Sequence, residues 1–122
     1  MAVEYVDGLN YAKLAEKLRE ELHTIAVVAD LSGKSLPADT DLLTSDLVSD
    51  FMGWFRLQII PASDAVVRAK VDGQLGALNG GAVLTANCFY EFDISCTKKT
   101  KLNLQISVAQ TPKLFKVYKV VV

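Results

Sequence analysis

The chain has 122 residues, of which 51% are hydrophobic and 22% are charged, so it is long enough to bury a core and too apolar for a disordered chain. Its formal net charge of −1 gives no support for bulk attraction to nucleic acid or to an anionic membrane. No apolar run approaches the roughly 20 residues of a membrane-spanning helix and the N-terminus lacks a secretion signal, so we expect synthesis in the cytoplasm without export.

Charge is unevenly distributed along the chain. Residues 1–50 carry ten acidic and four basic side chains, a balance of −6, whereas residues 51–122 carry four acidic and nine basic side chains, a balance of +5. An acidic N-terminal half and a basic C-terminal half of the chain can pair within one subunit or between neighbouring subunits. The weakness of surface ion pairs favours pairing within the subunit or simple solvation.

The first patterned segment is amphipathic. Apolar residues recur at three- and four-residue spacing from Tyr11 to Ala29, with charged residues on the opposite side. This spacing predicts a helix of about five turns that begins after an N-cap at Asp7 or Asn10, although Ile25-Ala26-Val27-Val28 could equally begin a strand. The apolar stripe could pack on the chain's own sheet or on the same helix of other subunits, and it is too short to indicate a coiled coil.

Residues 32–50 are polar and rich in turn-forming residues, which predicts a linker followed by a short edge strand or turn around Leu42 to Val48. Asp39, Asp41 and Asp46 could suggest a calcium loop. The Asp-x-Asp-x-Asp-Gly order of an EF-hand is missing, so capping and turn formation are the favoured roles.

The chain from Trp54 onward has the alternation of β-strands. Phe55, Leu57 and Ile59 share one face of a strand that Pro61 ends. The other elements expected outside residues 87–108 are a strand over 65–71, turns at Asp72-Gly73 and Asn79-Gly80-Gly81, and a last strand over 114–122 that is bulged or covered on both faces.

The strongest pattern runs from Asn87 to Val108 and predicts two strands joined by the basic turn 97–101 as an antiparallel hairpin. One face of the first strand carries Cys88, Tyr90, Phe92, Ile94 and Cys96, and one face of the second carries Leu102, Leu104, Ile106 and Val108. Cys88 and Cys96 would lie about 26 Å apart along an extended strand, so we expect two buried free thiols.

These elements predict a mainly β fold, namely a jelly-roll-like antiparallel β-sandwich over residues 35–122 preceded by an N-terminal helical arm over residues 1–34. The chain ends on Val120-Val121-Val122. Such an apolar end would be an exposed, aggregation-prone edge strand unless the sheet or another subunit covers it.

No catalytic motif is found, and we expect a protein that is not an enzyme and that uses no cofactor or metal. His23 is the single histidine, and the cysteines lack CxxC spacing. Glu91 and Asp93 could form a carboxylate pair for glycoside hydrolysis, but a solvated strand face explains them. The basic turn at residues 98–101 lacks the interleaved aromatics of a nucleic-acid site.

Three stretches carry a resemblance: Asp39 to Leu47, Leu78 to Asn87, and Tyr90 to Ile94. Over residues 36–122 the chain resembles small β-sandwich proteins of tailed or archaeal viruses and integrated proviruses, which are virion structural or capsid-decoration proteins. The resemblance implies a homo-oligomer, most often a trimer, bound to a major capsid protein in the virion. It offers no active site to carry over.

Two functions follow as hypotheses. The first is a non-enzymatic structural protein of a virus particle or similar assembly that self-associates without nucleic acid or membrane. The residues expected at its oligomer interface are Leu14, Leu18, Leu22, Ile25, Val120 and Val122. The alternative is a small binding module for a carbohydrate or protein partner, held on a sheet face or at the loops around 73–81. Exposed Trp54 or Tyr90 lining a groove would favour the alternative.

Overall fold

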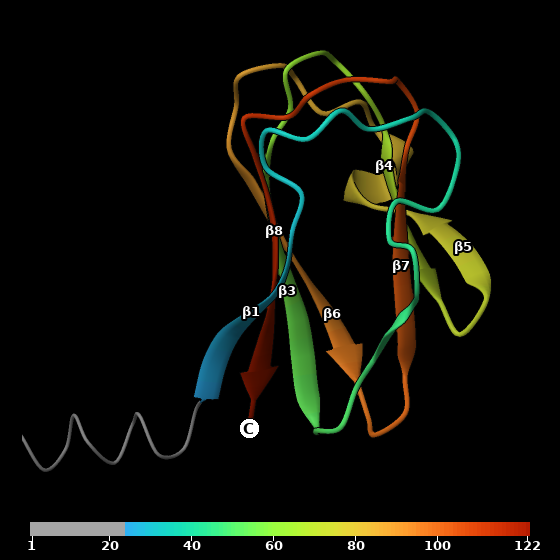
Figure 1. Cartoon of the computed structure of the whole chain (residues 1–122), viewed down its shortest axis with the longest axis vertical. Coiled ribbons are helices and arrows are strands. Elements are labelled where there is room, and N and C mark those ends of the chain that lie inside the picture. The colour runs from blue at the N-terminus through green and yellow to red at the C-terminus, as the bar shows by residue number, and fades with distance from the viewer. Residues whose placement is uncertain (1–23) are drawn as a thin grey trace, which may run out of the picture.

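The computed structural model describes residues 24–122, and this part of the chain is built almost entirely of β-strands (Figure 1). The elements are β1 (Thr24–Asp30), β2 (Leu47–Val48), β3 (Gly53–Ile60), β4 (Val67–Val71), β5 (Gln74–Ala77), the 3-10 turn η1 (Asn79–Gly81), β6 (Tyr90–Cys96), β7 (Lys101–Ile106) and β8 (Leu114–Val121). The expected short edge strand is therefore β2, and the expected strands over 65–71 and 114–122 are β4 and β8.

The strands form two antiparallel sheets of four strands each, which face one another across the core (Figure 1). The order in the first sheet is β1-β8-β3-β6, and the order in the second is β2-β7-β4-β5. The prediction of a mainly β, antiparallel fold is confirmed.

The core is filled by alternate residues of both sheets, as period-two patterning requires. The inward residues of β3 are Phe55, Leu57 and Ile59, which are all buried, as the sequence predicts. Across the core, the inward face of β7 carries Leu102, Leu104 and Ile106, and β8 contributes Phe115 and Val117.

The predicted hairpin between β6 and β7 is wrong, because the two strands lie in different sheets. The chain crosses from one sheet to the other at residues 97–100, where Ser49 holds it in place. The amides of Lys99 and Thr100 donate to the Ser49 carbonyl oxygen and Oγ at 2.7 Å and 2.9 Å. The apolar faces of the two strands thus oppose each other through the core instead of lying side by side. Alternation predicts which face is inward but not which strand pairs with which.

The helical pattern also fails after residue 23, because Thr24 to Asp30 is a strand that pairs with β8. The β-branched residues Ile25, Val27 and Val28 favour this outcome, which was the alternative left open by the sequence. Thr24 to Asp30 belongs to the first sheet and Leu31 to the core, so this part of the predicted arm is part of the β-sandwich instead. The rest of the expected helix, including Leu14, Leu18 and Leu22, lies outside the described residues.

β8 pairs with β1 on one side and β3 on the other, so the sheet itself covers the apolar C-terminal strand. The pairing with β3 is regular, and the bulge lies in β1 between Val27 and Ala29. Of the two explanations for the mixed pattern of β8, partial cover on both faces is therefore the correct one. Lys119 has inward parity, but it lies at the end of the sheet with its Nζ 6.0 Å from the Phe51 ring centroid.

The turns predicted from glycine are confirmed at both sites. Asp72 and Gly73, with φ of 50° and 83°, form the two-residue hairpin between β4 and β5, and the 3-10 turn η1 occupies Asn79–Gly81. In two-residue hairpins, positive φ at both central residues matches the right-handed twist of the strands.

Candidate interaction surfaces

The outer face of the first sheet ends in a group of apolar residues where β1 and β3 begin and β8 ends. Strand register places Val120 between Ile25 and Trp54 in one row. Met52 and Val122 lie one residue beyond β3 and β8, and the Val122 amide donates to the Met52 carbonyl oxygen at 3.1 Å. We call these five residues the basal apolar patch. Ile25, Met52 and Val122 keep 56%, 59% and 69% of their surface exposed, whereas Val120 keeps 2%.

Trp54 connects the basal apolar patch to the polar part of the same face. Its ring centroid lies 6.0 Å from the guanidinium carbon of Arg56. Its indole Nε1 is buried and has no hydrogen-bond partner within residues 24–122. An aromatic side chain held in this way offers a large apolar surface with little conformational freedom left to lose on binding.

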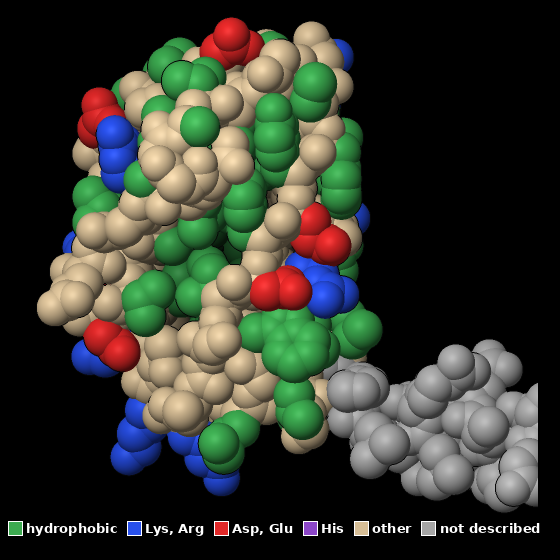
Figure 2. All heavy atoms as spheres, turned by 180° about the vertical axis from the view of Figure 1, so that it is seen from behind, with side chains coloured by type: hydrophobic (Ala, Val, Ile, Leu, Met, Phe, Trp, Pro, Cys, Tyr) green, Lys and Arg blue, Asp and Glu red, His purple; other side chains and the backbone are tan. Residues whose placement is uncertain are grey.

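The polar part of the face is a network of cross-strand pairs. Arg56 Nε lies 2.9 Å from Asp93 Oδ1 and 3.6 Å from Glu91 Oε2, and Gln58 Nε2 donates to Glu91 Oε2 at 2.9 Å. The hydrogen bond to Asp93 raises the pKa of the Arg56 guanidinium. Figure 2 shows acidic and basic side chains together beside hydrophobic ones at about mid-height on one side of the molecule. Glu91 and Asp93 thus belong to a solvated strand face, which was the favoured interpretation.

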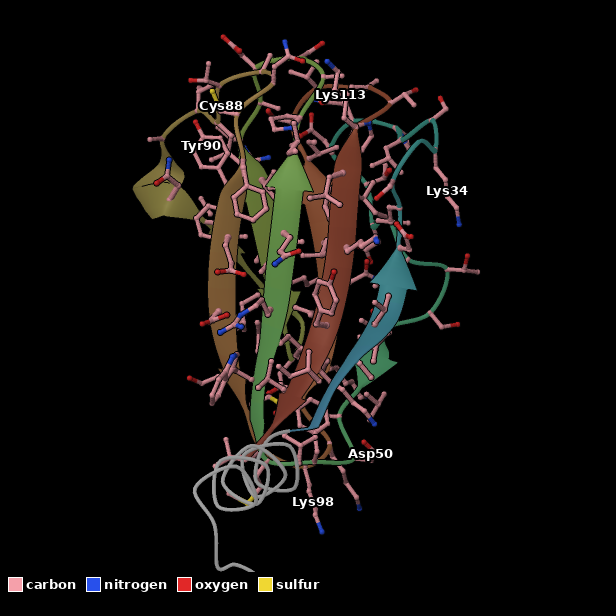
Figure 3. The ribbon with its side chains drawn as sticks, turned by 90° about the vertical axis from the view of Figure 1, so that its left-hand side faces the viewer. Lys34, Asp50, Cys88, Tyr90, Lys98 and Lys113 are labelled. Carbon is pink, nitrogen blue, oxygen red and sulfur yellow. The ribbon has the colours of Figure 1, made fainter. Side chains whose placement is uncertain are left out.

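Lysines surround the lower end of the molecule. Lys98 and Lys99 are exposed on the crossing between β6 and β7, Lys101 is exposed at the start of β7, and Figure 3 places Lys98 and Asp50 at this end. Ser49, which binds that crossing, precedes Met52 by three residues, so the lysines lie close to the basal apolar patch. The end therefore combines exposed apolar side chains with positive charge.

The aspartates of residues 36–46 bind side chains of the second sheet. Asp39 Oδ1 accepts from Arg68 at 3.3 Å, and Asp41 Oδ2 accepts from Lys70 at 3.1 Å. Hydrogen bonds from Gln105 and then from Lys70 lower the pKa of the Asp41 carboxyl. These contacts pair acidic residues of residues 1–50 with basic residues of residues 51–122 within one subunit, which is the arrangement that the sequence analysis favoured. Within residues 24–122, no three His, Cys, Asp or Glu side chains are grouped so that they could hold a metal ion.

A groove of about 600 Å³ lies between the β4–β5 hairpin and β6, and Figure 2 shows a hollow lined by hydrophobic side chains. Its lining includes Val71, Leu75, Leu78 and Ile94. Neither Trp54 nor Tyr90 lines this groove. The Tyr90 ring instead stacks on Phe92 with centroids 6.4 Å apart, and its hydroxyl accepts from the Thr85 amide at 2.9 Å.

The two cysteines are free, but only Cys96 is buried, so the expectation for Cys88 is wrong. Cys88 follows Asn87, which has a φ of 64°, and precedes the start of β6 at Tyr90. The strand predicted from the apolar alternation therefore began two residues too early. Burial raises the pKa of the Cys96 thiol, with a smaller opposing effect from the hydrogen bond to Ser49.

We expect a thiol reagent at neutral pH to modify one cysteine in the folded chain and two in strong denaturant. The thiolate is the reactive form, and Cys96 is both shielded and harder to ionise. Counting released chromophore checks this result. The Cys88→Ser variant should show no rapid reaction until it is unfolded, and rapid labelling of that variant in buffer would contradict the burial of Cys96.

Three of the six residues expected at an interface, Ile25, Val120 and Val122, come together in the basal apolar patch, and the other three lie outside the described residues. Met52 was not predicted from the sequence, and Trp54 was predicted only as an exposed aromatic of the alternative function, not as part of an interface. Both residues could have been found from the alternation along the chain, because they occupy the outward positions between the inward residues Phe51 and Phe55, on either side of Gly53.

No helix in the described range is both long and apolar enough to span a membrane. Comparison of the chain with protein-family models, curated proteins and solved structures finds no match.

Proposed function

We propose that this protein is a non-enzymatic structural subunit of a virus particle or similar assembly, and that it works by self-association. The observation that carries the proposal is the strand order. A long antiparallel ribbon of two arms that wraps into two sheets pairs its strands from the ends inward. The adjacent strands in the two sheets fit this scheme, since they include β1 with β8, β2 with β7, β3 with β6 and β4 with β5. An eight-stranded β-sandwich of this kind is a jelly roll, an architecture of viral capsid proteins that also occurs in lectin and cupin domains.

The basal apolar patch provides the second support. Monomeric proteins rarely expose contiguous apolar patches larger than a few hundred Å², and larger patches mark interaction sites. Met52 and Val122 lie opposite each other, Ile25 lies opposite Val120 in the next row, and Ile25, Met52 and Val122 are exposed at the end of the sheet where residues 1–23 join β1. The resemblance to virion structural proteins adds the expectation of a trimer that contacts a major capsid protein, and hence of a place in the virion.

The alternative, a binding module, would use the groove between the β4–β5 hairpin and β6. Carbohydrate sites commonly use an aromatic platform, and the groove lining contains neither Trp54 nor Tyr90. A sugar or peptide ligand that protects Leu75 and Ile94 while the chain remains a monomer would favour this alternative over the assembly subunit.

We expect the full chain to have the mass of an oligomer, three subunits in the first instance, when light scattering is measured at micromolar concentration. Met52→Lys should weaken the association at least about tenfold, because it buries a charge at an interface near lysines. Phe89→Lys is the matched control, since Phe89 is 55% exposed but lies beside Cys88 and Tyr90 at the opposite end (Figure 3). A clean monomer, or equal weakening by both variants, would contradict the proposal.

A further inference from the structure

We propose that β6 captures an extended strand of a partner protein in which basic side chains alternate with apolar ones. The strand pairs with the free edge of β6 and sends its apolar side chains into the groove between β6 and the β4–β5 hairpin. This surface uses none of the five residues of the basal apolar patch, so the inference goes beyond the proposed self-association and does not rest on it.

β6 has the longest regular free edge in the two described sheets. The strands at the ends of these sheets are β1, β6, β2 and β5. β1 is interrupted by a bulge between Val27 and Ala29, and β2 and β5 have only two and four residues. β6 has seven residues and pairs with β3 in unbroken register. An added strand therefore finds its longest template at β6.

The free edge of β6 presents the backbone groups of Glu91, Asp93 and Ser95. Because the Val122 amide donates to the Met52 carbonyl oxygen, register directs the even-numbered residues of β3 to β8 and the odd-numbered ones to β6. The odd-numbered residues of β6 then point their amides and carbonyl oxygens away from β3. Within residues 24–122 no loop backbone bonds to these groups. They form the row of donors and acceptors that an incoming strand completes.

The space beside this edge is an apolar channel rather than a closed cavity. The inward positions of β5 are Gly76 and Gln74, which pair with Ala69 and Val71, so β5 places no large apolar side chain there. The groove of about 600 Å³ lies between these residues and Ile94 (Figure 2). A second hollow of about 230 Å³, which also touches Val71, continues along the end of β6. A channel that follows a strand fits an extended chain better than a compact ligand.

The core is closed under β3 and open under β6. Phe55 and Leu57 keep only 2% and 1% of their surface exposed. Ile94 and Phe92, which pair with them on β6, are only partly buried. In an added strand, the residues opposite Ile94 and Phe92 would point inward, because cross-strand partners share one face. Apolar side chains at these positions would complete the core on this side.

The charges along the edge favour a basic strand and disfavour a second copy. Glu91 and Asp93 point outward, with 40% and 48% of their side chains exposed, and with Arg56 they carry two negative charges and one positive charge, a balance of −1. A two-fold axis at the middle of β6 would place Asp93 of two copies directly opposite each other, and like charges in that position destabilise a strand pair. Lysine or arginine at the outward positions of a partner strand would make attractive pairs instead.

Amide hydrogen exchange of the full chain with a synthetic peptide tests this strand capture. The probe is a capped seven-residue peptide in which valine alternates with lysine, and the control peptide has glutamate in place of lysine. At saturation we expect the lysine peptide to slow exchange at the Glu91, Asp93 and Ser95 amides at least about tenfold, because these amides gain hydrogen-bond partners. The glutamate peptide should bind at least about threefold more weakly.

Two variants separate the contribution of the groove from that of the charges. A Cβ at Gly76 meets nothing within 4 Å, so Gly76→Leu can place its side chain in the groove. It should weaken binding of the lysine peptide about tenfold or more, because it excludes an apolar peptide side chain from the groove. Gly76→Ala is the matched control and should stay within about fourfold of the parent chain. Glu91→Lys changes the local balance from −1 to +1 and should reverse the preference between the two peptides.

Three results would overturn strand capture. Protection of the β6 edge amides that rises with protein concentration in the absence of peptide would assign the edge to a second copy. Binding that perturbs the groove without protecting these amides would assign the groove to a ligand other than a strand. Equal affinity for the two peptides would remove the selection by charge. Light scattering separates this proposal from the previous one: capture by a monomer would contradict self-association alone, and an oligomer that captures no peptide would contradict strand capture alone.

Discussion

Gly53→Ala is expected to lower the free energy of unfolding by about 2–4 kcal/mol, because it combines backbone strain with overpacking. Gly53 has a φ of +151°, which residues with a Cβ rarely adopt. A Cβ built at this position would lie 2.0 Å from the carbonyl oxygen of Val120 and 3.1 Å from its carbonyl carbon. Both atoms belong to the backbone of β8, so the clash can be relieved only by moving paired strands apart.

Gly76→Ala is the matched control for this change. Gly76 lies in β5, where a Cβ would meet nothing within 4 Å, and alanine there should change stability by no more than about 0.5 kcal/mol. Urea denaturation of the two variants and the parent chain measures the difference. Equal midpoints for Gly53→Ala and the parent would show that β3 and β8 do not approach as closely as the structure has them.

Gly53 also links the fold to the proposed assembly. It stands between Met52 and Trp54, and its pairing partner Val121 stands between Val120 and Val122. The close approach of β3 and β8 at this point brings four of the five patch residues together at the end of the sheet. A change at Gly53 should therefore weaken self-association as well as folding, whereas Met52→Lys should affect association with a much smaller effect on folding.

The faces of the strands could be predicted from the sequence, whereas their partners could not. Phe55, Leu57 and Ile59 alternate with polar residues, and this period is a local property that survives in the fold. The pairing of β6 with β3 instead of β7 depends on contacts between residues that are far apart in sequence. A short polar connection such as 97–100 serves equally well for a hairpin within one sheet and for a crossing between two.

For the basal apolar patch, too, some member residues could be predicted from the sequence, whereas their neighbours in the sheet could not. Val120 and Val122 could be named because an apolar strand at the end of the sheet requires cover, whereas Ile25 was named as part of the apolar stripe of the expected helix and lies instead on β1. Their contact with Met52 and Trp54 is a consequence of register between β1, β8 and β3, which no local pattern specifies. The parity of Met52 and Trp54 around Gly53 predicts their face, and only the sheet order shows which residues lie beside them.

The segment that covers the second sheet depends on a buried amide, and Asn103→Leu is expected to lower the free energy of unfolding by about 2–4 kcal/mol. Asn103 is 2% exposed although it points away from the core. Its Nδ2 donates to the Leu43 carbonyl oxygen at 3.1 Å and to Asp46 Oδ1 at 2.8 Å, and its Oδ1 accepts from the Leu43 amide at 3.0 Å. Leucine would leave both backbone groups of Leu43 without these partners, and each unpaired buried group costs about 1–3 kcal/mol.

Gln105→Leu, two residues along the same face of β7, is the control for Asn103→Leu. Gln105 makes one side-chain hydrogen bond, to the exposed Asp41 at 2.9 Å, so its loss should cost no more than about 1 kcal/mol. Urea denaturation compares the stabilities, and hydrogen exchange at the Leu43 amide reports whether residues 42–46 have detached from β7. If Asn103→Leu unfolds at the same urea concentration as Gln105→Leu and keeps the Leu43 amide protected, this segment is held by its backbone contacts, such as the Leu42 amide to the Leu104 carbonyl oxygen at 2.9 Å, rather than by the amide.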